Sequence, residues 1–167
     1  MELDEQLVYL DHTRRLLNMA KFSLEFNPTY NEAKALINKY ESEIDLYEDT
    51  TVSKYDTNCL EDSLKEYHEM TSIVELLKNA IIYSMITTKI RKFGNVTLDA
   101  LITQAKVAEK EANFLHRYVH KLIECHADDD SIDEAYSAYD RKLDEVNELQ
   151  TKIDYIEANY KVDVSSI

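Results

Sequence analysis

The chain has 167 residues, and its 33 acidic residues against 19 basic ones give a formal net charge of −14. One glycine and one proline are too few for the turns of a β-sandwich, a β-barrel or a doubly wound sheet. Apolar residues make up 44% of the chain, which argues against disorder and is enough to form a core. The composition therefore predicts an all-α protein.

The charge balance and the termini limit the classes of partner and compartment. Direct binding to nucleic acid or to an anionic membrane requires Lys and Arg against phosphate, whereas an acidic surface attracts basic partners. The chain has two cysteines, too few for a disulfide framework, and it begins with no secretory signal pattern. Charged residues interrupt its most apolar stretch, residues 73–90. We expect a cytoplasmic protein that neither spans nor binds a membrane.

The first two helices are expected over residues 2–26 and from Pro28 to about Tyr47. Asn27 and Pro28 separate them, because the residue before a proline avoids the helical region and proline suits a first helical turn. The apolar stripe of the first helix consists of Leu3, Leu7, Leu10, Leu17 and Leu24. Residues 48–58 form the longest polar connection.

A third helix is expected from a cap at Asn58 to about Lys92, with apolar residues on nearly every side of its second half. Gly94 and Asn95 end it, and Thr97 caps a fourth helix. Apolar residues of that helix alternate spacings of three and four, which predicts a heptad seam. The seam consists of Leu98, Leu101, Ala105, Ala108, Ala112, Leu115, Val119 and Leu122.

The fifth helix is expected from a capping box of Ser131 and Glu134 to about Tyr160. Short connections around Gly94 and Asp129 predict that the long helices are antiparallel neighbours. The predicted fold is an elongated antiparallel helical bundle of about five helices, with coiled-coil-like long hairpins. It forms one domain over residues 1–162 and ends in a frayed tail, residues 163–167.

Charge is distributed unevenly along the chain. Residues 41–70 carry −8 and residues 124–157 carry −9, while residues 71–123 carry +4. Pairing the third helix with the fourth would bring the acidic stretches to one end of the bundle. This end is a candidate docking surface for a basic protein; ordinary solvated helix faces are the alternative. The candidate partner-binding residues are Glu61, Asp62, Glu66, Glu69, Asp128, Asp129 and Asp130.

His116, His120 and Glu124 are candidate metal ligands, because spacings of four place them along one helical face. The heptad register turns them away from the seam, so exposed histidines of an acidic helix are the alternative. No Glu-x-x-His pair occurs in the chain, which excludes a ferritin-like di-iron site. We expect no cofactor. Cys59 and Cys125 are expected to be small packing residues.

Tyrosines are abundant, with 12 in the chain. Tyr136 and Tyr139 fall at seam positions of the fifth helix, where packing in the core or at an interface is expected. Tyr30 and Tyr155 are expected to be exposed, which suits a protein interface.

From about Glu75 onward the chain resembles the septicolysin-like family of small bacterial helical proteins. The resemblance rests on Thr88–Lys89, on the helix opening Val96–Leu101, and on Leu149–Ile153. It implies a helical, oligomeric protein. We transfer no functional residue from it, and the chain has no basic amphipathic helix or long apolar segment that would favour pore formation.

The leading functional hypothesis is a non-enzymatic acidic adaptor or inhibitor that docks on a basic protein surface. Its narrower form is a nucleic-acid mimic that occupies the groove of a nucleic-acid-binding protein. A self-assembling structural protein, a homo-oligomer held by the two long seams, is the second hypothesis. A metal-dependent helical enzyme using His116, His120 and Glu124 is the third.

Overall fold

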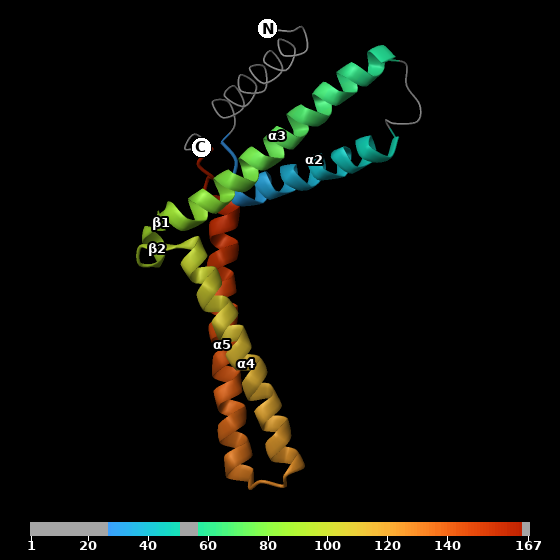
Figure 1. Ribbon diagram of the computed structural model, residues 1–167. Coiled ribbons are helices and arrows are strands. Elements are labelled where there is room, and N and C mark those ends of the chain that lie inside the picture. Colours follow the sequence, from blue (N-terminus) through green and yellow to red (C-terminus); the bar gives the residue numbers. More distant parts are fainter. Residues whose placement is uncertain (1–26, 51–56, 165–167) are drawn as a thin grey trace, which may run out of the picture. The chain divides into compact units, whose positions relative to one another are not determined.

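The computed structural model describes residues 27–50 and 57–164, without the side chains of residues 47–50 and 57–63. The described elements are α2 (Tyr30–Thr50), α3 (Thr57–Thr87), β1 (Lys89–Ile90), the 3₁₀ helix η1 (Arg91–Phe93), β2 (Val96–Thr97), α4 (Leu98–Glu124) and α5 (Asp129–Asn159) (Figure 1). This mostly helical fold, with α2 packed on α3 and α4 packed on α5, confirms the all-α prediction. The helix expected over residues 2–26 lies outside the described residues.

The chain divides into two compact units. One unit contains the described residues up to Ser84 together with those from Ala158 onward, and the other spans Met85–Glu157. Each unit is described separately below. The expected single bundle over residues 1–162, including the pairing of the helices on either side of Gly94, joins elements of both units and stays a prediction.

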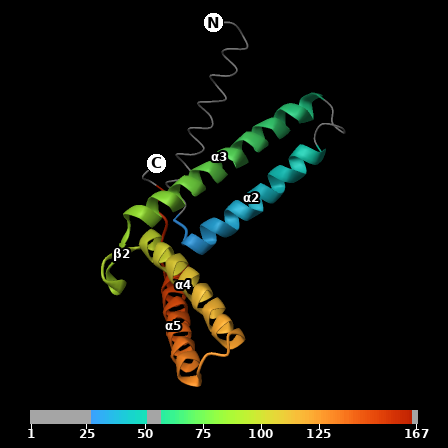
Figure 2. The ribbon, with the colours of Figure 1, turned by 60° about the horizontal axis from the view of Figure 1, so that its bottom comes forward.

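In the first unit, α2 and α3 form an antiparallel pair (Figure 2). Small and branched apolar residues pack between the two helices. An ion pair also joins them, with the Lys78 ammonium 2.6 Å from the Glu41 carboxylate. Helix α2 begins one residue after Thr29, whose hydroxyl oxygen accepts the Glu32 backbone N–H at 3.2 Å. The cap is therefore Thr29, and Pro28 precedes the helix. The buried residues of the pair include Tyr30, Ala33, Ile37, Val74, Leu77, Ala80 and Ile81.

The C-terminal segment packs against the start of α2 and the end of α3 in the same unit. The Val162 N–H donates to the Pro28 carbonyl at 2.8 Å, and the Asp163 N–H donates to the buried Ser84 hydroxyl at 2.8 Å. Val162 and Val164 are both buried. Residues 163 and 164 are therefore packed, contrary to the expected frayed tail; residues 165–167 lie outside the described residues.

Helix α3 differs from its expected bounds at both ends. It begins at Thr57, so Asn58 lies inside the helix and the predicted cap is wrong. It ends at Thr87, five residues before the expected end at Lys92. Ile82 and Ile86 are more than half exposed, so the helix is not buried on nearly every side.

A short β-hairpin follows α3. Lys89 pairs with Thr97 and Ile90 with Val96, and the turn between them places both Gly94 (φ 86°) and Asn95 (φ 59°) in the left-handed region, which these two residue types adopt most readily. The sequence predicts a helix over this segment as far as about Lys92. The Gly-Asn pair marks the reversal that overrides it.

Aromatic and cationic side chains attach this hairpin to α5 within the second unit. Phe93 and Tyr155 make an edge-to-face contact with ring centroids 5.9 Å apart. The Lys92 ammonium lies 3.8 Å from the centre of the Tyr155 ring, and the Lys152 ammonium lies 5.8 Å from that of Phe93. Such contacts contribute to stability even near the surface.

We expect Leu77→Ala to lower the free energy of unfolding by about 2–5 kcal/mol, because the Leu77 side chain is fully buried and its loss leaves a cavity. Leu46→Ala is the matched control on α2, where the leucine is 62% exposed, and should change stability by less than about 0.5 kcal/mol. Urea unfolding followed by circular dichroism measures both. Equal losses in the two variants would contradict the core described here.

Candidate functional site

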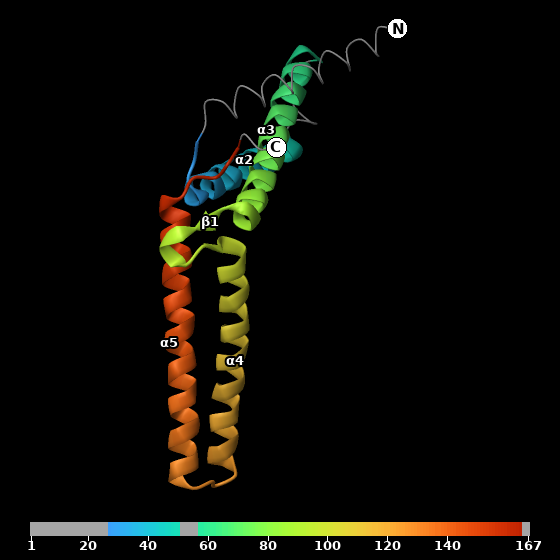
Figure 3. The same cartoon turned by 90° about the vertical axis from the view of Figure 1, so that its left-hand side faces the viewer.

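Helices α4 and α5 run side by side as a long antiparallel hairpin (Figure 3). The Thr97 hydroxyl accepts the Ala100 backbone N–H at 3.2 Å, which confirms the predicted cap of α4. The Asp128 carboxylate accepts the Ser131 N–H at 3.3 Å, so Asp128 caps α5 and the predicted cap at Ser131 is wrong. Ser131 lies instead at the third helical position, whose N–H the cap satisfies.

The predicted heptad seam forms the contact between the two helices. The buried residues of α4, namely Leu98, Leu101, Ala108, Ala112 and Val119, all belong to it. Glu111 pairs with Lys142 and His116 contacts Tyr139 across the hairpin. Residues whose numbers sum to about 254 therefore lie at the same level along the two antiparallel helices.

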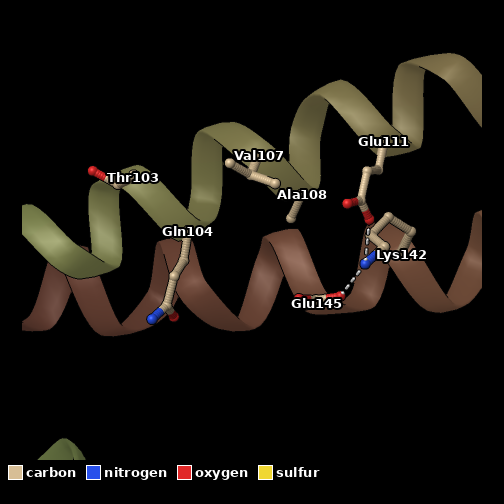
Figure 4. Close-up of a pocket in the computed structure, with 7 residues that line it drawn as sticks. All are labelled: Thr103, Gln104, Val107, Ala108, Glu111, Lys142 and Glu145. Carbon is tan, nitrogen blue, oxygen red and sulfur yellow. Dashed lines mark hydrogen bonds and ion pairs between the residues drawn. The ribbon is translucent and has the colours of Figure 1, made fainter.

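Lys142 occupies one side of the hairpin, which we call the front face. Its ammonium lies 2.7 Å from the carboxylates of both Glu111 and Glu145 (Figure 4). Hydrogen bonds to Glu111 first, and then to Glu145, raise the pKa of Lys142 above its ordinary value of 10.5. These side chains line a shallow groove of 270 Å³ together with Thr103, Gln104, Val107 and Ala108.

The opposite side, the back face, carries aromatic and imidazole rings. The rings of His116 and His120 lie edge to face with centroids 4.6 Å apart. His116 also contacts Tyr139 at 5.2 Å, and Tyr139 contacts Tyr136 at 6.2 Å. The back face is therefore a chain of ring contacts that runs from α4 onto α5.

The predicted metal ligands do not form a coordination site in the described part of the chain, where no group of three or more His, Cys, Asp or Glu side chains is placed to hold an ion. The Glu124 carboxylate instead lies 3.5 Å from the Lys121 ammonium. Metal binding by His116, His120 and Glu124 gains no support from this geometry.

An acidic stripe runs along the outer side of α5. It consists of Asp133, Asp140 and Asp144, whose spacings of seven and four place them within about 40° of one another around the helix. All three are exposed. The neighbouring positions on this side, Ser137, Asn147 and Thr151, are uncharged. The stripe therefore presents negative charge with no basic side chain of α5 between its carboxylates.

The predicted partner-binding residues fall on both units. Asp128, Asp129 and Asp130 are exposed at the start of α5, and Asp128 also acts as its cap. Glu66 and Glu69 lie on α3, where each already has an interaction within the chain. Glu61 and Asp62 lie on α3 too, and their side chains are outside the described residues. Whether these sets form one acidic end stays a prediction.

Sequence reasoning missed the acidic stripe because it summed charge by segment. These carboxylates can be recognised as one stripe only after the structure shows which side of α5 packs against α4, because the stripe lies on the side away from that contact. Two predictions of side-chain exposure were wrong. Tyr30, expected to be exposed, is 1% exposed. Cys125, expected to be packed, lies on the surface. Tyr136 is 51% exposed and Tyr155, as expected, is also accessible.

No family model, curated protein or solved structure matches the chain. The resemblance to the septicolysin-like family therefore stays a prediction. Among the described residues, no helix combines the length and the apolar character needed to cross a bilayer.

We expect the stabilising effect of Lys142 to depend on pH. Its pKa is raised in the folded protein, so its contribution is fully present below the unfolded-state pKa and is lost as the pH rises through the folded-state pKa. The difference in unfolding free energy between the wild type and Lys142→Met should therefore be larger at about pH 8 than at about pH 11. Urea titrations at the two pH values measure it.

Lys121→Met is the control for this measurement, because the Lys121–Glu124 pair is exposed and lies within one helix, where such pairs contribute little. A wild-type minus Lys142→Met difference that is identical at both pH values would contradict the assigned role of the two carboxylates.

Proposed function

We propose that the protein is a non-enzymatic interaction protein that docks on a basic protein surface through the acidic stripe of α5. The observation that carries the proposal is the exposed alignment of Asp133, Asp140 and Asp144 on one side of a long helix. The net charge of −14 adds a long-range field of the same sign. Such a field speeds the encounter with a basic partner and suppresses binding to acidic ones.

The stripe is suited to a protein surface by its shape. Two antiparallel helices present a straight, narrow edge, and the stripe extends over about 17 Å from Asp133 to Asp144 at 1.5 Å per residue. Exposed carboxylates at such an edge remain solvated until a cationic partner replaces the water. Charge-assisted hydrogen bonds to Arg or Lys are the favoured contacts.

The charge density of α5 gives less support to the narrower proposal, a nucleic-acid mimic. Duplex DNA carries one charge per about 1.7 Å of its axis. Helix α5 has ten acidic residues over 31 residues, or one per roughly 4.6 Å of helix. A general basic protein surface is therefore the better match for this hairpin alone.

The stripe variant Asp133→Asn, Asp140→Asn, Asp144→Asn tests the proposal. The tagged wild type should recover a stoichiometric basic partner from nuclease-treated lysate of the native source. The stripe variant should recover it at least about tenfold less, because three charged contacts are lost. Mass spectrometry quantifies the recovery, and the affinity for the purified partner should fall steeply with added salt.

The control variant Asp45→Asn, Glu75→Gln, Glu109→Gln removes the same number of negative charges from exposed positions on α2, α3 and α4. It should retain the partner. Equal loss in both variants would reduce the effect to net charge, and binding that is insensitive to salt would contradict docking through the stripe. Competition by duplex DNA for the same partner would favour the mimic.

A further inference from the structure

The front face of the hairpin carries large apolar side chains that its own two helices leave uncovered. Val107 is 52% exposed, Phe114 61% and Tyr118 47%. Spacings of seven and four align them along α4, and the rings of Phe114 and Tyr118 stack with centroids 6.3 Å apart and planes 8° from parallel. Val107 also lines the groove that contains Lys142. An aligned aromatic stripe of this kind is typical of an interface.

The outer margin of this apolar stripe is basic. Lys110, Arg117 and Lys121 are exposed and lie about 60° around α4 from Val107, Phe114 and Tyr118 respectively, each three residues further along the chain. Their long side chains have the reach to contact whatever covers the rings. A partner that covers the front face would therefore meet positive charge along the α4 margin.

The α5 margin of the same face is mainly acidic. On this side α5 carries three exposed glutamates, Glu134, Glu145 and Glu148. Glu145 is also paired with Lys142. Arg141 is the exception on this margin, and by the register of the hairpin its level falls between those of Lys110 and Arg117 of α4. By the register of the hairpin, Lys110 is level with the neighbourhood of Glu145, and Lys121 is level with Glu134.

We propose that the front face binds a second copy of the chain, with α4 of each copy packed on α5 of the other around a two-fold axis parallel to the helices. This axis keeps every residue at its own level and exchanges the two helices. It therefore sets Lys110 beside Glu145 of the other copy, and Lys121 beside Glu134. The alternative two-fold axis, across the helices, would pack α4 on α4 and oppose basic margins, so charge complementarity selects the first arrangement.

The size of the face is sufficient for a stable dimer. Helix α4 has 27 residues and is therefore about 40 Å long. Two helices side by side are about 20 Å wide, so the face offers roughly 800 Å² per copy, which is the standard contribution of one partner to a specific interface. Phe114 lies three residues from the middle of α4, near the centre of the face, where aromatic anchors contribute most to affinity.

This assembly is independent of the proposed docking function and is compatible with it. The acidic stripe lies about 100–140° around α5 from the front face. Asp133, Asp140 and Asp144 would remain exposed in the dimer.

Sedimentation of the full chain tests the proposal directly. The wild type should sediment at twice its 19.5 kDa at protein concentrations of about 1 to 100 µM. Tyr118→Glu should raise the dissociation constant by roughly 30-fold or more. Tyr136→Glu is the matched control, because Tyr136 is equally exposed, lies at the same level and belongs to the back face; it should leave the dimer unchanged.

A charge exchange tests the pairing of α4 with α5. The variant Lys110→Glu, Lys121→Glu should be monomeric, because it sets glutamate beside Glu145 and Glu134 of the other copy. The variant Glu134→Lys, Glu145→Lys should be monomeric too, because it sets lysine beside Lys121 and Lys110. An equimolar mixture of the two should form a heterodimer. Both variants alter exposed residues, and an unchanged helical circular dichroism spectrum verifies that they fold.

A wild type that stays monomeric over the whole concentration range would overturn the proposal, and would mean that another segment or partner covers the rings. A dimer that survives Tyr118→Glu but not Tyr136→Glu would overturn the choice of face. A mixture of the charge variants that remains monomeric would overturn the pairing of α4 with α5.

Discussion

Two helices packed as a hairpin bury one stripe of each helix, and the rest of the second unit follows from that constraint. The seam of α4 buries Leu98, Leu101, Ala108, Ala112 and Val119. Every other side chain stays on one of two flanks or on the outer side. The front face, the back face and the acidic stripe are the three surfaces that remain. Their different chemistry is what gives a simple hairpin a candidate function.

The two flanks differ although they border the same seam. On the front face a lysine between two glutamates closes the groove beside exposed aromatic rings. On the back face the contacts join imidazole and phenol rings, from His120 through His116 and Tyr139 to Tyr136. Only the front face combines uncovered apolar area with margins of opposite charge on its two helices. A second hairpin with the same asymmetry complements it, which is why a copy of the chain is favoured over an unrelated helix.

Helix existence and the α4 seam could be predicted from the sequence because they depend on local spacing and on capping residues such as Thr97. The β-hairpin after α3 could not, since Ile90 and Val96 read as helix or strand until the left-handed turn at Gly94 and Asn95 sets them opposite each other. The start of α5 was misplaced for a related reason. Asp128 and Ser131 are both suitable cap residues. In the structure Asp128 is the cap, and a tight turn with His126 in the left-handed region (φ 54°) precedes it. The surfaces were the least accessible to sequence reasoning, because an exposed side of a helix is defined only by what covers the other side.

The proposed dimer would present the docking surface twice. In this dimer two hairpins would stack front to front around a two-fold axis parallel to the helices. The acidic stripes of the two copies would then lie on opposite edges of the four-helix assembly. A partner with two basic surfaces, or an array of identical partners, would then bind both edges with an effective concentration set by the rigid spacing between them. In the proposed dimer the basic margin of α4 would face the acidic margin of α5 of the other copy, while the acidic stripe would stay outside. A two-fold interface uses the front face of both copies, so no front face would remain free and the assembly would stop at two; this separates a closed dimer from an open self-assembling polymer.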